Sequence, residues 1–393
     1  MERLSGVLKN HDWGSPTAIP EFLGVEPDGN PWAEVWFGAH PLGPSPVAAD
    51  KDLAQLIEED AQRTLGPSTL HSLGNELPYL VKLIAPAMSL SLQVHPNRVK
   101  AAGGFGWEES TGIPQDDRAR SFPDATHKPE ILYALTPVDA LIGFSVRRQA
   151  RRRLEGLDTT LSSRLHRRLM LAAGRGLRPV VSWILDPEDG PTPDEINQFA
   201  AACTKRLEEG GSPDPYIDET MGRLQQQFPG DPGIVIAFLM NHAHLRPGDA
   251  VFVPTGTIHA YQYGLGLEVM ANSDNVVRAG LTSKHVDRDL FLDLALFDGL
   301  PATRIAPEHP VPGIDMFRSP VEDFELAIAS PTGSPLPVPG TGPRILVGLG
   351  GTPTVETRQE SIVLPQGHAV FVGDAEGQIV LHGDGRVAAI TVP

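Results

Sequence analysis

Short alternating runs of apolar and polar residues fill the first 146 residues of the chain and return from residue 245 to the end. Gly and Pro turns bound these runs, which is typical of β-strands joined by short loops. The segment between them, residues 147–244, is Leu-rich and has apolar residues at helical spacing. The pattern therefore predicts a mainly β protein that is interrupted by a helical insertion.

Helix signals are clearest around residue 192. Thr192 can cap a helix, Pro193 suits its first position, and Glu195 completes a capping box ahead of an apolar stripe. A shorter helical stretch is predicted at residues 51–74, where we expect Gly66–Pro67 to end the helix.

One strand sequence occurs twice, as LRPGDAVFVP at residues 245–254 and as LPQGHAVFVG at residues 364–373. The constant offset predicts a duplicated β-barrel unit. His259 in the first unit corresponds to Gln378 in the second, so we expect one functional barrel and one that serves packing. The predicted division is a catalytic barrel from 1–146 and 245–300, an all-α insertion at 147–244, and a C-terminal barrel without a metal site at 301–393.

Polar side chains share one face of the predicted strand at residues 90–95. Leu90, Leu92 and Val94 alternate with Ser91, Gln93 and His95, so one face is apolar and the other can carry chemistry. A solvent-exposed polar sheet face is the alternative.

Two further strands place charges among apolar residues. Lys82 interrupts the run PYLVKLIAP, where a lysine is tolerated if its ammonium reaches an anion or a water-filled cavity. Lys128 and Glu130 lie two residues apart and so share a strand face, while Pro129 favours an edge or the first residue of a strand.

The stretch from Phe252 to Lys284 combines histidine, glutamate, arginine and lysine with a short apolar framework. Glu268 lies between two apolar residues, and a buried charge of this kind is normally paired or bound to a metal. Residues 272–275, Asn-Ser-Asp-Asn, predict a tight turn that positions Arg278.

The barrel assumption brings Gln93, His95, Glu130 and His259 together. Two imidazoles, one carboxylate and one amide oxygen suit zinc or another first-row divalent ion with positions open for a substrate. The sequence therefore predicts a catalytic metal site.

The formal net charge of −17 opposes binding to nucleic acid or to anionic membranes, and a small anionic substrate would need a local basic cluster. No apolar run is long enough to span a bilayer, and a single cysteine with a polar N-terminus favours a cytoplasmic location. The arginines at residues 147–153 suggest either an anion site or a solvated helix face, and we favour the solvated face. Trp13, Trp32, Trp36 and His40 are interpreted as packing residues.

Four motifs, LSLQVHPN, HKPE, LRPGDAVFVPTGTIHAY and GLEVMANSDNVVRAGLTSKHVD, resemble the hallmarks of type I mannose-6-phosphate isomerase, a zinc-dependent cupin family. With the WG and AEVWFGAHP elements, the resemblance spans nearly the whole chain. It implies a cupin-type jelly-roll catalytic barrel, a second degenerate cupin barrel and one Zn²⁺ per chain. It implies zinc ligands Gln93, His95, Glu130 and His259, catalytic roles for Arg278 and Lys128, and phosphate contacts from Ser91, Lys82 and Lys284. The chain departs from the family at Thr126, where Asn is usual, and at His11, where Tyr is usual.

The implied reaction interconverts mannose 6-phosphate and fructose 6-phosphate by moving a proton between C2 and C1 through an enediolate. We expect Arg278 and the metal to stabilise the charge on O1 and O2. Glu268 is the preferred base because burial raises a carboxyl pKa, unless Arg278 or Lys284 pairs with it. His127, Lys128 and Asp274 are alternatives for proton transfer or ring opening.

Two other classes of function fit parts of the pattern. A metal-dependent oxygenase could use a similar ligand set, but it would leave the phosphate lysines unexplained. A non-catalytic sugar-phosphate binding protein would be expected to lose a ligand or Arg278, and none is lost. The expected partner is a small sugar phosphate, and the expected state is a monomer.

Overall fold

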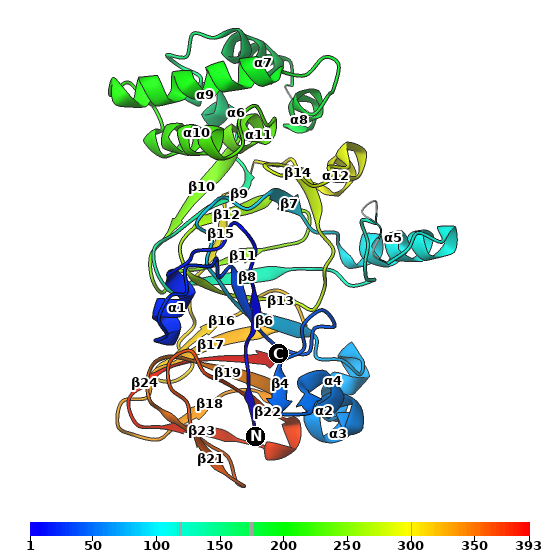
Figure 1. The fold of residues 1–393 in the computed structure, drawn as a ribbon, viewed down its shortest axis with the longest axis vertical. Helices are drawn as coiled ribbons and strands as arrows, with labels where there is room; N and C mark the ends of the chain where they lie inside the picture. Colours follow the sequence, from blue (N-terminus) through cyan, green and yellow to red (C-terminus); the bar gives the residue numbers. More distant parts are fainter. Residues whose placement is uncertain (116, 118–119, 173, 175, 300) are drawn as a thin grey trace.

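The computed structural model describes residues 1–393 except 116, 118–119, 173, 175 and 300. Four antiparallel β-sheets are stacked along the long axis of the molecule, and a group of helices covers one end of the stack (Figure 1). The protein is therefore mainly β with a helical insertion, as the hydrophobic pattern predicts. The described strands form no closed barrel, because their pairing gives separate open sheets.

The two sheets nearest the helices have five and seven strands. In order, the five-stranded sheet contains β10 (Met240–Leu245), β9 (Val138–Phe144), β12 (His259–Tyr263), β7 (Leu92–Val94) and β14 (Val277–Gly280). The seven-stranded sheet contains β15 (Thr303–Ile305), β11 (Ala250–Val253), β8 (Glu130–Ala134), β13 (Gly266–Ala271), β6 (Tyr79–Ile84), β3 (Glu34–Phe37) and β2 (Val7–Lys9).

The other two large sheets have six and four strands and lie at the opposite end (Figure 1). The six-stranded sheet contains β1 (Glu2–Leu4), β22 (Ala369–Val372), β19 (Thr341–Gly351), β24 (Gly385–Val392), β17 (Glu325–Ala329) and β16 (Ile314–Phe317). The four-stranded sheet contains β18 (Leu336–Val338), β23 (Ile379–His382), β20 (Thr354–Glu356) and β21 (Ser361–Val363), and a small ribbon pairs β4 (Pro46–Ala48) with β5 (Lys51–Asp52).

Six of the twelve α-helices that the structure describes lie in the insertion. These are α6 (Arg147–Arg153), α7 (Thr160–Leu171), α8 (Arg178–Ile184), α9 (Pro193–Glu208), α10 (Pro215–Gln227) and α11 (Gly233–Phe238). The others are α1 (Ala18–Leu23), α2 (Leu53–Glu59), α3 (Ala61–Thr64), α4 (Gly66–Leu73), α5 (Arg98–Thr111), α12 (Arg288–Leu294) and the short 3₁₀ turn η1 (Asp374–Glu376).

Strand alternation decides which side chains reach the space between the five- and seven-stranded sheets. Leu267 and Val269 of β13 pack in the core shared with the six-stranded sheet, so Glu268 points the other way. Val81 on β6 joins the same core, so Lys82 also points the other way, and it pairs directly opposite Glu268 in the strand register. The seven-stranded sheet therefore presents charged groups to its neighbour.

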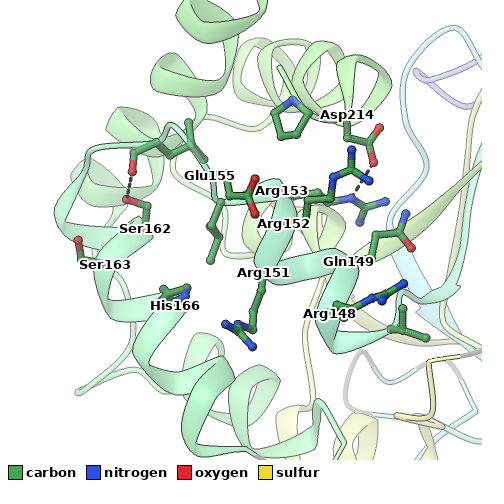
Figure 2. A pocket seen from close by; sticks show the side chains of 14 residues that line it. Arg148, Gln149, Arg151, Arg152, Arg153, Glu155, Ser162, Ser163, His166 and Asp214 are labelled. Carbon is green, nitrogen blue, oxygen red and sulfur yellow. Dashed lines mark hydrogen bonds and ion pairs between the residues drawn. The ribbon is translucent and has the colours of Figure 1, made fainter. Parts of the chain in front are cut away.

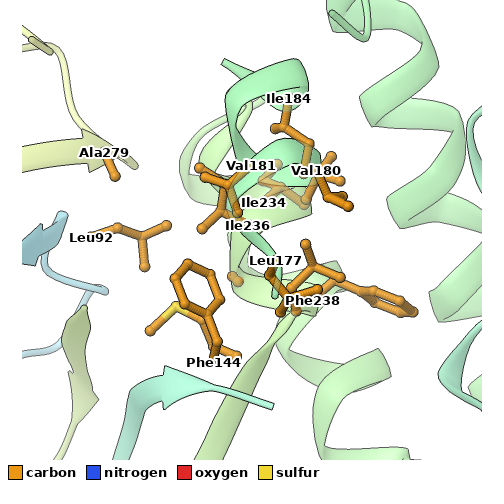
Figure 3. Packing of buried hydrophobic residues seen from close by; sticks show 14 of the residues in the cluster. Leu92, Phe144, Leu177, Val180, Val181, Ile184, Ile234, Ile236, Phe238 and Ala279 are labelled. Atoms are coloured by element: carbon orange, nitrogen blue, oxygen red, sulfur yellow. The ribbon is translucent and has the colours of Figure 1, made fainter. Parts of the chain in front are cut away.

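The helical insertion packs against the outer face of the five-stranded sheet. Figure 3 shows Leu92 and Phe144 from this sheet meeting Val181, Ile236 and Phe238 from the insertion. Because Leu92 faces the helices, the next residue along β7, Gln93, faces the seven-stranded sheet.

The structure changes four details of the predicted elements. Gly66 begins α4 rather than ending a helix, and its positive φ of 81° suits glycine. Strand β10 starts at Met240, before the expected restart at Leu245, and pairs with β9. Glu130 opens a central strand rather than an edge strand, so Pro129 lies just before it. Strand β1 pairs with β22 of the C-terminal half.

Helix α9 agrees with its prediction in detail. Thr192 accepts a hydrogen bond from the backbone of Glu195, the Glu195 side chain accepts from the backbone of Thr192, and Pro193 is the first helical residue. Among the helices that the structure describes, none has the length and apolar character needed to cross a membrane.

Candidate metal centre and active site

The four predicted metal ligands come from both sheets and meet between them. Gln93 on β7 and His259 on β12 lie directly opposite each other in the strand register, and His95 follows β7. Glu130 enters from the seven-stranded sheet, with its carboxylate oxygens 3.2 Å from His95 Nε2 and 3.3 Å from His259 Nε2. His95, Glu130 and His259 are buried, with exposures of 1%, 1% and 0%.

Both imidazoles form a backbone hydrogen bond through Nδ1, which leaves Nε2 as the acceptor nitrogen of each ring. His95 Nδ1 donates to the carbonyl of Asn275 at 2.6 Å, and His259 Nδ1 donates to the carbonyl of Thr257 at 3.0 Å. With the proton on Nδ1, the Nε2 of each ring is an acceptor that faces the carboxylate acceptors of Glu130. His95 Nε2 is buried and has no hydrogen-bond donor. A cation among these atoms would satisfy all of them, so the residues fit a divalent metal.

Gln93 completes this group. Its side-chain amide lies 3.3 Å from His259 Nε2, with the nitrogen toward the ring. Rotating the amide exchanges its nitrogen and oxygen, so Oε1 can join the same set of ligand atoms.

Electrostatics keep His95 and Glu130 in the protonation states that a metal requires. Burial, assisted by the Lys128 ammonium, lowers the pKa of His95 to about 4, so the ring is neutral near pH 7. Burial alone would raise the pKa of Glu130, but Lys128 and the two imidazoles hold it well below its usual value. Lys128 Nζ lies 3.2 Å from Glu130 Oε1.

A buried turn fixes the orientation of His95. The carbonyl that holds His95 belongs to Asn275, and the turn around Asn275 is tied to the carboxylate of Asp124. Asp124 accepts hydrogen bonds from Ser273 Oγ at 2.9 Å and from the backbone of Asp274 at 2.7 Å. The Asn-Ser-Asp-Asn turn therefore holds the metal ligand His95 in place, and it also leads into the strand that carries Arg278.

Replacing Asp124 with Asn should weaken zinc binding by about tenfold. The amide nitrogen of Asn cannot accept the hydrogen bonds that the Asp124 carboxylate accepts, so the turn that holds His95 would be less well fixed. The measurement is the zinc dissociation constant by competition with a chelator. Glu58→Gln, which removes the same charge from the exposed face of α2, is the control. Equal zinc affinity in both variants would contradict the supporting role.

A cavity of about 480 Å³ opens above this group. Its walls include every predicted catalytic and phosphate-binding residue and two of the predicted metal ligands, namely Lys82, Ser91, Gln93, Lys128, Glu130, Glu268, Asp274, Arg278 and Lys284. His11, Trp13 and Trp36 also line it, so these side chains belong to the wall of the cavity. The volume suits a ligand of the size of a sugar phosphate.

Glu268 pairs with Lys82 rather than with Arg278 or Lys284. Lys82 Nζ lies 3.2 Å from Glu268 Oε2 and 3.9 Å from Glu34 Oε1. Burial opposes the charge on Lys82, but these carboxylates raise its pKa above the usual value. Burial raises the pKa of Glu268, although Lys82 opposes that shift.

Two cations at the rim of the cavity have no carboxylate partner among the described residues. Arg278 lies opposite Gln93 in the strand register, and burial lowers its pKa. Lys284 is exposed, and its pKa is lowered by partial burial and by the nearby charge of Arg278. Ser91 lines the same cavity. This group favours an anion at the rim.

Two histidines differ from their sequence interpretation. His40, expected to serve packing alone, is buried and places Nε2 3.3 Å from Asp274 Oδ2. The backbone N–H of Leu42 donates to His40 Nδ1, so the proton of the neutral ring is on Nε2 and faces Asp274. His127, an alternative for proton transfer, lies outside the cavity wall and contacts Asp323 at 2.9 Å. The sequence around His40 gave no signal of this contact.

Comparisons with known proteins point to one family. The model of the type I phosphomannose isomerase catalytic domain matches residues 1–147. Mannose-6-phosphate isomerase of Escherichia coli K12 is 31% identical, with 99% of each chain covered. Mannose-6-phosphate isomerase of Rattus norvegicus is 29% identical, covering 95% of this chain and 93% of its own. A crystal structure of mannose 6-phosphate isomerase bound with zinc and yttrium is 31% identical, covers 100% of this chain and 99% of that chain, and has a TM-score of 0.89. This chain therefore belongs to the type I mannose-6-phosphate isomerase family.

Proposed function

We propose that this protein is an aldose–ketose isomerase that interconverts D-mannose 6-phosphate and D-fructose 6-phosphate with one zinc ion per chain. The observation that carries the proposal is the buried group of two imidazoles and one carboxylate beside a cavity that Glu130 lines, together with two cations of the cavity wall that lack a carboxylate partner among the described residues. Such a site can hold a phosphorylated sugar at one end and polarise its reacting carbons at the other.

The ligands assigned to zinc are Gln93, His95, Glu130 and His259. When bound there, zinc supplies a Lewis acid that polarises a carbonyl oxygen and stabilises the negative charge that develops on O1 and O2. Arg278, across the strand pair from Gln93, adds a fixed positive charge near the same oxygens.

Proton transfer is assigned to Glu268. Its carboxylate would remove the proton from C2 to form the enediolate and return it to C1, and the raised pKa makes it a stronger base than an ordinary glutamate. The Lys82 ammonium at 3.2 Å holds the carboxylate in place. Lys128 and Asp274 line the same cavity and are assigned to ring opening.

The phosphate group is assigned to the rim, where Lys284 and Ser91 are the strongest candidates. Lys82 is the third predicted phosphate contact, but its ammonium already faces Glu34 and Glu268, which leaves it less available to a third anion.

Replacing Lys284 with Gln should raise KM for mannose 6-phosphate by about tenfold with little change in kcat, because the lost charge contacts the phosphate equally in substrate and transition state. Steady-state kinetics test this expectation. Lys205→Gln on the exposed face of α9 is the control. A fall in kcat at constant KM would instead place Lys284 in the chemical step.

We also propose that the fold is of the cupin type. Each pair of sheets, the five- with the seven-stranded and the six- with the four-stranded, shares an apolar core, as expected if each is a jelly roll. The sequence that β11 and β22 share supports a duplication, in which we propose that the second unit lacks a metal site. The predicted domains, 1–146 with 245–300, 147–244 and 301–393, follow from this scheme. A monomeric state and a cytoplasmic location stay predictions.

The proposed function is tested by incubating the purified protein with mannose 6-phosphate and measuring fructose 6-phosphate. Unphosphorylated mannose at the same concentration is the control for the rim cations, and oxygen consumption is followed in parallel. Formation of fructose 6-phosphate without oxygen uptake is expected. Folded, zinc-loaded protein that forms no product would favour a binding protein, and oxygen uptake would favour an oxygenase.

A further inference from the structure

A second and larger cavity lies in the helical insertion, away from the metal centre. Its volume is about 1000 Å³, and it is formed around α6 and the start of α7 (Figure 2). Its lining shares no residue with the cavity above the metal ligands. The side chains in this cavity, which we call the α6 groove, are Val146, Arg148, Gln149, Arg151, Arg152, Arg153, Leu154, Glu155, Leu157, Ser162, Ser163, His166, Pro213 and Asp214.

Three arginines form one stripe along α6. Arg148, Arg151 and Arg152 are spaced at i, i+3 and i+4, so they occupy the same side of the helix. Figure 2 shows them projecting from α6, with Ser163 and His166 on the neighbouring helix α7. The groove thus has basic groups on one wall and hydrogen-bonding groups on the other.

A fourth arginine fixes the helix that carries this stripe. Arg153 is buried and its Nε donates to Asp214 at 2.8 Å, while its Nη1 donates to the carbonyls of Phe238 at 3.0 Å and Met240 at 2.7 Å. Its charge is offset by Asp214, and its contacts attach α6 to α10 and α11. The stripe therefore stands on a rigid support.

The three groove arginines lack an acidic partner, whereas several arginines around them have one. Arg164, Arg168 and Arg206 in the same insertion are paired with Glu195, Asp189 and Asp218. Among the described residues, no carboxylate lies within ion-pair distance of Arg148, Arg151 or Arg152. Two carboxylates line the groove, and among the described residues Asp214 is paired with Arg153 while Glu155 has no arginine partner. The groove consequently has net positive charge within a protein whose net charge is −17.

The unpaired arginines destabilise α6. Like charges at i+3 and i+4 destabilise a helix, and the first turn of α6 has no acidic residue. In addition, Arg151 Nε is buried without a hydrogen-bond acceptor. A bound anion would supply both the missing charge and the missing acceptor. The cavity and the absence of partners therefore favour an anion site over the solvated helix face that the sequence alone favoured.

We infer that the α6 groove binds a small anion with two or more phosphoryl groups. Guanidinium groups match phosphate oxygens in pairs, and three of them exceed what a single phosphoryl group needs. The protein's overall negative charge opposes a long polyanion such as nucleic acid, whereas a small anion meets mainly the local field. Ser163 and His166 add hydrogen-bond donors for the rest of the ligand. This inference does not depend on the isomerase reaction.

The probe is inorganic pyrophosphate, titrated into the full-length protein at low ionic strength by calorimetry. The test variant is the triple substitution R148Q/R151Q/R152Q, and the charge-matched control is R167Q/R246Q/R358Q, which changes three exposed arginines outside the groove. Because charge-assisted hydrogen bonds are lost, pyrophosphate should bind at least about tenfold more weakly to the triple variant than to the wild type or the control. Isomerase turnover should stay unchanged.

Three results would overturn the inference. The first is no pyrophosphate binding by the wild-type protein, and the second is equal weakening in both triple variants, which would mean general attraction by surface charge. The third is binding of orthophosphate as tight as that of pyrophosphate, which would exclude the need for two phosphoryl groups. The single substitution R152Q, at an exposed position, repeats the test if the triple variant is unstable.

Discussion

Replacing His259 with Ala should remove both zinc and isomerase activity, with turnover falling by roughly a thousandfold or more. His259 is fully buried and supplies one of only two imidazoles in the metal-ligating group of described residues. Alanine leaves Glu130 facing a cavity instead of a ligand atom. Zinc content per chain and turnover, measured on the same preparation, test this prediction.

His368→Ala is the matched control, because His368 is exposed and just precedes β22, the strand whose sequence repeats that of β11. Its zinc content and turnover should equal those of the wild type. A zinc-free His259 variant with wild-type turnover would show that the reaction does not need this metal site.

Replacing Glu268 with Gln should lower turnover by about 10² to 10⁴ while zinc stays bound, because the amide keeps the shape of the side chain but cannot accept the C2 proton. Glu34→Gln is the matched control, since Glu34 also faces Lys82 and lines the same cavity. If Glu268 only neutralises Lys82, the two variants should lose similar activity. If Glu268 is the base, its variant alone should be severely impaired.

The pH dependence of the wild-type enzyme gives a second measure of the same role. Burial raises the pKa of Glu268 above the ordinary 4.5, and only the deprotonated form can act as a base. Activity should therefore fall as the pH decreases through this raised pKa, so the acid limb of kcat/KM should lie above pH 4.5. An acid limb at or below the ordinary value would argue against Glu268.

Local sequence signals predicted much of the fold and of the site's composition. The capping box at Thr192 is a contact between residues three apart, so the sequence contains all of it. Alternation likewise predicted that Gln93 and Leu92 point to different faces of their strand, because a strand has a fixed period. These features need no knowledge of distant segments.

Contacts between distant segments were not predictable in the same way. Alternation shows that Lys82 and Glu268 leave the core, but only the register of β6 against β13 makes them direct neighbours. The pairing of β1 with β22 joins the two ends of the chain and has no local signal. His40 reaches Asp274 through a similar long-range contact, and no spacing in the sequence indicates it.

The arginines of α6 illustrate the same limit. Their sequence fits a solvated helix as well as an anion site, because the distinction depends on whether acidic partners lie nearby. The structure supplies that information through the paired Arg153 and the unpaired residues around it.

Chelation tests whether this chain is a zinc-dependent mannose-6-phosphate isomerase. Isomerisation of mannose 6-phosphate is measured before chelation, after complete removal of metal, and after zinc is added back. We expect activity to disappear with the metal and to return with about one zinc ion per chain, because the buried ligands form a single site. Activity that persists in metal-free protein would contradict zinc-dependent catalysis at this site.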